Sequence, residues 1–221
     1  MTPTPQVSDA HAAPSRVSIL ARLVPAFSYA IPMLGAALSA LFLLGVIRAM
    51  RMAETAGVAA VAGGMAEANL AIVVALYLAI FVGFIGIVFM AIRSFMSTTT
   101  ASPAASFFLI TGIISLIPPL LLWEGQSLMV AAITPGGGGI VHFVSSIRLC
   151  LSLAIISPAV FGLILLVASL IPLPKVLRAN HNWAPLLVLV LMELALIGMA
   201  VAFQVRTSWF HQVKFAERIQ P

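Results

Sequence analysis

The sequence predicts an all-α fold, a bundle of five transmembrane helices, and three observations lead to this prediction. Hydrophobic residues make up 62% of the chain, charged residues make up 8%, and the mean hydropathy is +1.17. Polar side chains are therefore too few to cover a water-soluble globule. The apolar residues are gathered in runs of the roughly 20 residues that a helix needs to cross the hydrocarbon core. Runs of this length also argue against a transmembrane barrel, whose short strands alternate apolar and polar residues.

Five apolar runs carry the prediction, and short polar connections separate them. We expect transmembrane helices at about Leu23 to Ile47, Ala66 to Ile92, Ala105 to Trp123, Ile140 to Ile171 and Trp183 to Val205. Basic residues flank these runs singly or in pairs, which is typical of anchors at lipid headgroups. The expected organisation is a flexible N-terminal tail over residues 1–22, a five-helix domain over 23–205 and a basic C-terminal tail over 206–221.

Charged, proline-rich or glycine-rich segments mark the end of each run. The polar stretch MTPTPQVSDAHAAPSR precedes the first run, which stops before Arg48, and the second run stops at Arg93. The third is followed by EGQSLMVAAITPGGGG and the fourth by PLPKVLRANHN, whose prolines are poor helix formers. The fifth stops before Arg206. None of the connections could fold as a soluble domain, so the function lies within the membrane or in a partner.

The sequence also disfavours several classes of function. It contains no glycine-rich phosphate loop, no spaced His and Cys cluster and no nucleophile motif, so we expect no enzyme activity and no metal site. The net charge is +5, but the basic residues flank apolar runs, so the expected partner is the lipid bilayer and not nucleic acid. No cofactor can be named, and a haem or pigment ligand among the four histidines stays open. Basic residues are nearly balanced between the two sides, so charge does not decide the orientation.

Glu193 lies near the middle of the fifth run, where a charge costs roughly 2.5 to 3.5 kcal/mol on insertion scales. Counting about 1.5 Å per residue from the same membrane face puts Thr111 and Ser115 of the third run at its depth. These hydroxyls are the expected partners of Glu193. The same count puts Arg148 about 20 Å away in depth, which argues against a salt bridge. Glu193 is therefore either a neutral, hydrogen-bonded acid that joins two helices or a group that handles protons.

Glu67 heads a stripe of small residues at the start of the second run. Steps of four residues from it give Ala71, Ala75, Ala79 and Gly83, a face on which another helix can approach closely. The stripe predicts that Glu67 points toward a helix contact. On the stripe alone, the simpler interpretation is an interfacial carboxylate in the first helical turn, where the helix dipole favours negative charge.

Two short motifs in the first two runs resemble a known family. The stretch PMLG, from Pro32 to Gly35, precedes GMAEA, from Gly64 to Ala68. Together they resemble the pore-lining helices of the proton-channel family that includes flagellar MotA, TolQ and ExbB. The resemblance covers about residues 32–93. It does not extend to the family's additional N-terminal helix or its cytoplasmic helical domain.

The resemblance implies a proton-conducting, force-transducing subunit of an oligomeric complex. Glu67 falls on the family's glutamate and Ser39 on a pore threonine, whereas Ile72 stands in the place of a second pore threonine. It further implies a bacterial inner membrane, a cytoplasmic N-terminus and a single-span partner that supplies the ion-binding acid. Two alternatives stay open. One is a structural or anchoring subunit of a larger redox or photosynthetic membrane complex, and the other is a small proton-coupled transporter that uses Glu193.

Overall fold

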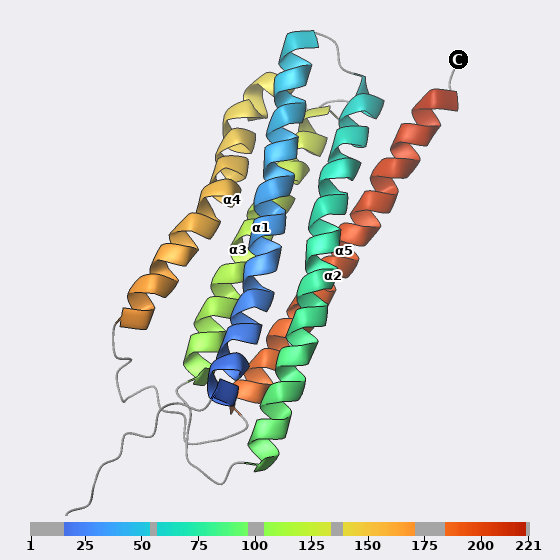
Figure 1. The fold of residues 1–221 in the computed structure, drawn as a ribbon. Coiled ribbons are helices and arrows are strands. Elements are labelled where there is room, and N and C mark those ends of the chain that lie inside the picture. Colours follow the sequence, from blue (N-terminus) through green and yellow to red (C-terminus); the bar gives the residue numbers. More distant parts are fainter. Residues whose placement is uncertain (1–15, 54–56, 97–103, 134–138, 171–183, 220–221) are drawn as a thin grey trace, which may run out of the picture.

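The structure, a computed structural model, is a bundle of five helices (Figure 1). It describes residues 16–53, 57–96, 104–133, 139–170 and 184–219, which contain no β-strand. The helices are α1 (Arg16–Ala53), α2 (Val58–Met96), α3 (Ala104–Ile133), α4 (Gly139–Leu170) and α5 (Ala184–Ile219). Each of them has a stretch long and apolar enough to cross a membrane. The predicted fold class is confirmed, and the chain is a multi-pass integral membrane protein.

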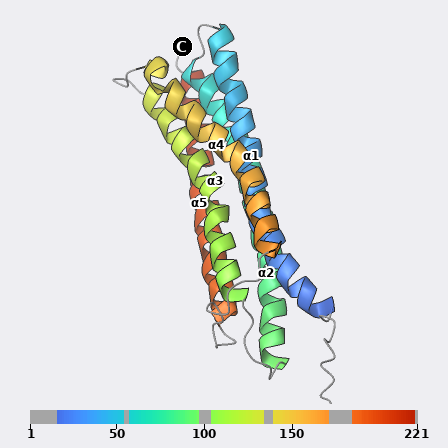
Figure 2. The ribbon, with the colours of Figure 1, turned by 90° about the vertical axis from the view of Figure 1, so that its left-hand side faces the viewer.

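Successive helices run in opposite directions along the bundle (Figure 1). Helix α1 packs against α2, α3 and α4, whereas α2 lies between α1 and α5. Helix α3 contacts α4 on one side and α5 on the other. Figure 2 shows α4 crossing α1 obliquely, so that the two helices diverge toward one end of the bundle. The first helix therefore packs extensively against three of the other four.

The helices are longer than the apolar runs that predict them. Helix α5 has 36 residues and continues through the segment expected to be a basic tail, which makes it about 54 Å long at 1.5 Å per residue. The added length has a packing reason, because Phe203, Thr207 and Phe210 are buried at helical spacing. The Lys214 ammonium lies over Gly63 of α2, where an added Cβ would be 3.1 Å from Nζ. The segment after Val205 thus belongs to the bundle.

Two serine hydroxyls fix the register of α1 against α2. Ser28 Oγ donates to the Ala79 carbonyl at 2.7 Å, and Ser39 Oγ donates to the Ala68 carbonyl at 2.6 Å. The two serines are eleven residues apart, as are the two carbonyls. Eleven residues are about three helical turns, so both hydroxyls lie on one face of α1 and both acceptors on one face of α2. The helices are locked antiparallel over this length.

The predicted small-residue stripe of α2 lies largely in helix contacts. Ala75 is so close to Gly35 of α1 that a Cβ on the glycine would overlap the alanine methyl group. Ala79 and Gly83 are buried, but Glu67 is exposed, so the prediction that Glu67 points toward a helix contact does not hold within this chain. The reason is geometric. Four residues turn a helix by about 40° more than one full turn, so a stripe that faces α1 at Ala75 has turned away by Glu67.

Candidate functional site

Glu193 lies where α5 meets α2 and α1. Its side chain is buried, with 7% of its surface exposed, and its carboxyl group is seated against Gly83 of α2. A Cβ on Gly83 would overlap Glu193 Oε2 and would lie 2.8 Å from the Ser28 hydroxyl of α1. The missing side chain of Gly83 therefore provides the space that the carboxyl group fills. Three helices enclose this acid.

Two polar atoms at this level have no hydrogen-bond partner among the described residues. They are Glu193 Oε1 and the hydroxyl of Tyr29, both of which are buried. Tyr29 belongs to α1, is 2% exposed and lies within electrostatic range of the Glu193 carboxyl group. A buried polar group without a partner costs about 1 to 3 kcal/mol, and buried groups of this kind are uncommon. We call Glu193, Tyr29, Ser28 and Gly83 the acid cluster.

The structure corrects the predicted partners of Glu193. Thr111 and Ser115 each donate a hydrogen bond of 2.7 Å to a carbonyl of their own helix, and neither is bonded to the acid. The count of depth was nevertheless sound, because the sulfur of Met192 packs against Gly112 of α3. One residue turns a helix by about 100°. Met192 consequently faces α3, whereas Glu193 faces α2.

A second buried polar pair joins α2 to α3. Gln126 Nε2 donates to Asn69 Oδ1, and both side chains are fully buried. The remaining amide atoms, Asn69 Nδ2 and Gln126 Oε1, have no hydrogen-bond partner within the described helices. Sequence reasoning missed this pair because it placed Gln126 in a connection after the third apolar run. The signal was an amide at Asn69 within an apolar run, which needs a polar partner on a neighbouring helix.

Apolar side chains separate the two polar levels. Ser28 of the acid cluster and Ser39 beside Asn69 are about 16 Å apart along α1, given their spacing of eleven residues. Ile72 is fully buried between these levels, and its Cδ1 lies 3.4 Å from a Cβ placed on Gly35. The hydroxyl of Ser39 is bonded to a backbone carbonyl. The described residues of one chain therefore do not form a continuous polar line.

Glu67 and Ser39, the predicted pore pair, do not come together within one chain. Ser39 of α1 lies in the contact with α2, whereas Glu67 lies on the outer face of α2. Ser39 is fully buried in the contact between α1 and α2. Glu67 instead shares an exposed face of α2 with Leu70, Val74 and Phe81. The carboxylate thus stands at one end of an apolar surface that faces lipid or another subunit.

Arg206 joins α5 to α3, although the sequence placed it only as a basic flank. Its guanidinium lies 4.1 Å from the centroid of the Trp123 ring, and Nη2 donates to Ser127 Oγ at 3.1 Å. Trp123 also packs edge to face against Phe203 of α5. A guanidinium over an indole ring is attracted by the negative face of the ring. Arg206 therefore has a structural role between two helices.

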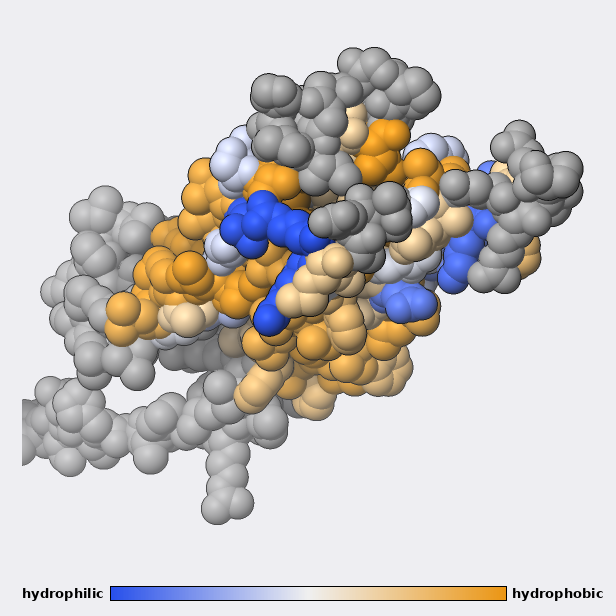
Figure 3. All heavy atoms as spheres, turned by 90° about the horizontal axis from the view of Figure 1, so that it is seen from above, coloured by the Kyte–Doolittle hydropathy of each residue, from blue (hydrophilic) through white to orange (hydrophobic). Residues whose placement is uncertain are grey.

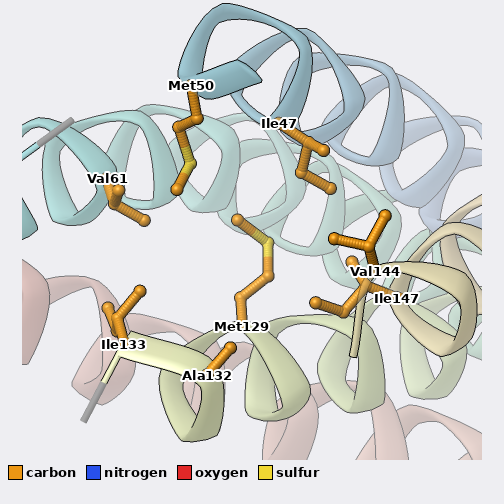
Figure 4. Close-up of a pocket in the computed structure, with 8 residues that line it drawn as sticks. All are labelled: Ile47, Met50, Val61, Met129, Ala132, Ile133, Val144 and Ile147. Carbon is orange, nitrogen blue, oxygen red and sulfur yellow. The ribbon is translucent and has the colours of Figure 1, made fainter. Parts of the chain in front are cut away.

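An apolar cavity of about 10 Å³ lies near the end of the bundle where α1 finishes (Figure 4). Met50 and Met129 point toward one another across it (Figure 4). Its lining consists of Ile47, Met50, Val61, Met129, Ala132, Ile133, Val144 and Ile147. A space of this size holds at most one water, and an apolar lining offers that water no hydrogen bond. The cavity is a packing gap and not a ligand site.

The acid cluster is the strongest candidate among the described residues. Within the part of the chain that the structure describes, no group of three His, Cys, Asp or Glu side chains could hold a metal ion. A carboxylic acid and a phenol can each give up and accept a proton, so the cluster has the chemistry of proton exchange. No family model matches the chain, and no characterised protein or solved structure is significantly similar to it.

Proposed function

We propose that this protein is a membrane-embedded subunit of a proton-coupled, energy-transducing complex and that Glu193 exchanges the proton. The observation that carries the proposal is a buried carboxyl group, Glu193, with an oxygen that has no partner among the described residues, in a cluster that also holds the unpaired Tyr29 hydroxyl. Ionisable side chains inside membrane spans are rare and mark ion and proton pathways. The protein has no enzymatic role in this proposal.

The hydrogen bonding around Glu193 favours a proton on the acid. Ser28 donates its hydroxyl hydrogen bond to the Ala79 carbonyl. Toward Glu193, the Ser28 oxygen can therefore act only as an acceptor. A protonated carboxyl group can donate to such an acceptor, whereas a carboxylate would face it with like partial charge. Tyr29 is the one neighbour in the acid cluster whose hydroxyl is still free to donate. A hydrogen bond from Tyr29 to Glu193 would stabilise the ionised acid.

The resemblance to the MotA, TolQ and ExbB family adds an oligomeric arrangement to the proposal. Glu67 is exposed on α2, so it takes part in a proton path only where a neighbouring subunit covers that face. Ser39 would support that path from inside the contact between α1 and α2. The same resemblance supports a bacterial inner membrane, a cytoplasmic N-terminus and a single-span partner.

The second candidate is a structural subunit that anchors a larger membrane complex. The buried Ile72, which interrupts the polar residues of the bundle, favours this alternative. In that case Glu193 is a neutral acid that fills the gap at Gly83 and holds α5 against α2. The two candidates differ in whether Glu193 must titrate.

The experiment measures proton flux in inverted membrane vesicles that contain the complex, with a pH-sensitive dye and an imposed gradient. Glu193→Gln keeps the shape of the side chain and removes its acid, so we expect it to abolish flux as fully as Glu193→Leu. Glu124→Gln, which removes an exposed acid of α3, is the matched control and should conduct normally. If Glu193→Gln conducts like the unmodified protein at equal insertion, Glu193 is structural and the anchoring role is the better explanation.

A further inference from the structure

An open groove of about 690 Å³ lies between α1 and α4, away from the acid cluster. Its lining consists of Leu44, Arg48, Arg51, Met52, Arg148 and Ser152. Half of these residues are arginines, and none of the described residues of the lining is acidic. All three arginines are exposed. Three guanidinium groups that share one groove repel one another, so the groove is a site of concentrated positive charge.

The groove lies at the boundary of the apolar spans. Arg51 is in the last turn of α1, and the apolar span of that helix ends at Met52. Arg148 follows closely after Val144, where the apolar span of α4 begins. Viewed from this end, hydrophilic side chains lie among hydrophobic ones (Figure 3). The guanidinium groups are thus at the level where lipid phosphates meet the hydrocarbon core.

Apolar side chains continue from the groove toward the membrane interior. On α1, Leu41 is seven residues before Arg48, and on α4, Ile156 is eight residues after Arg148. These spacings are about two helical turns, so each apolar residue lies below the arginine of its own helix. Leu41 is 53% exposed and Ile156 is 54% exposed. The two helices therefore present an arginine-lined upper surface and an apolar lower surface.

We propose that this groove binds the headgroup of an anionic phospholipid that carries two phosphate groups, with its acyl chains along α1 and α4. Guanidinium forks match phosphate oxygens in bidentate geometry, and three positive charges are better neutralised by two phosphates than by one. Basic pockets between membrane helices are known to take such headgroups. A free phosphate ion would leave Leu44 and the apolar surface below it uncovered, whereas a lipid covers both.

The test is native mass spectrometry of the full-length protein in detergent with three added lipids. They are tetraoleoyl cardiolipin with two phosphates, phosphatidylglycerol with one, and zwitterionic phosphatidylcholine. We expect the cardiolipin to bind most tightly. Because a basic residue near an anionic headgroup contributes about fivefold in affinity, Arg148→Gln should weaken its binding by about that factor. Loss of Arg48, Arg51 and Arg148 together should abolish the preference over phosphatidylcholine.

Lys214→Gln is the matched control, because it removes one positive charge at the same end of the bundle but outside the groove lining. Lys214→Gln should leave the affinity for cardiolipin unchanged. If it weakens binding as much as Arg148→Gln does, net charge alone explains the affinity and the proposal is wrong. Equal binding of all three lipids would overturn it as well. A further arm adds inorganic pyrophosphate at millimolar concentration. If pyrophosphate displaces the lipid completely from the groove, the ligand is a free anion and the assignment to a lipid is wrong.

Discussion

Gly35→Ala should destabilise the bundle, because no space exists for the added methyl group. The new Cβ would overlap the Cβ of Ala75, which is fixed to the backbone of α2 and cannot rotate away. The helices α1 and α2 must therefore separate. Overpacking of a core costs about 1 to 3 kcal/mol, and alanine returns about 0.8 to 1.0 kcal/mol of helix propensity over glycine. The net loss should be about 0 to 2 kcal/mol, with a further contribution from the strained serine bonds on either side.

Reversible unfolding in mixed dodecylmaltoside and sodium dodecyl sulfate micelles, followed by circular dichroism, measures this loss. Gly45→Ala is the matched control on the same helix, because nothing lies within 4 Å of its Cβ position, and it should be neutral or slightly stabilising. The double variant Gly35→Ala with Ala75→Gly moves the methyl group from one helix to the other. It should recover most of the loss, which corresponds to a coupling of about 0.5 to 3 kcal/mol. If Gly35→Ala matches Gly45→Ala in stability, the close contact between α1 and α2 is not real.

Three further predictions concern the polar groups of the bundle. Asn69→Leu and Gln126→Leu should each destabilise more than the double variant in the same unfolding assay, because each single change leaves a buried amide alone. Arg206→Gln should lower stability by about 0.5 to 2 kcal/mol through the lost ring contact, and unchanged tryptophan fluorescence would contradict this contact. Gly83→Ala should displace the acid, so the infrared carboxyl band of Glu193 should shift, whereas Gly45→Ala should leave that band in place.

Hydropathy predicts the membrane spans well because the thickness of the bilayer sets their minimum length. Every apolar run had to reach across the hydrocarbon core, so residue counts alone located the five helices and the depth of Glu193. The contact of Met192 with Gly112 confirms that depth. Small residues likewise predicted a close packing surface, and the contact at Ala75 agrees with it. These features depend on composition and length, which a single sequence contains.

Rotation about the helix axes could not be predicted in the same way. The hydrophobic residues surround most of each helix, so no polar face tells which side is buried, and Glu193 was assigned to α3 when it faces α2. Gln126 was missed for a related reason, since a polar stretch after an apolar run resembles a loop although it continues α3. The helical course of α5 beyond Arg206 was also missed, because its buried face depends on α2. The orientation of Glu193, the helical position of Gln126 and the length of α5 all depend on contacts between helices.

The paired serine bonds between α1 and α2 constrain how this protein can move. Sliding one helix by a single residue would break both hydrogen bonds together, because their spacing is equal on the two helices. These hydrogen bonds therefore oppose sliding of α1 along α2. Helix α5 meets α2 at two glycines, Gly63 and Gly83, which face Lys214 and Glu193. At Gly83 the carboxyl group fills the space that a Cβ would occupy, so α5 could not turn without withdrawing Glu193 from this position, and a change in access to the acid would require that movement.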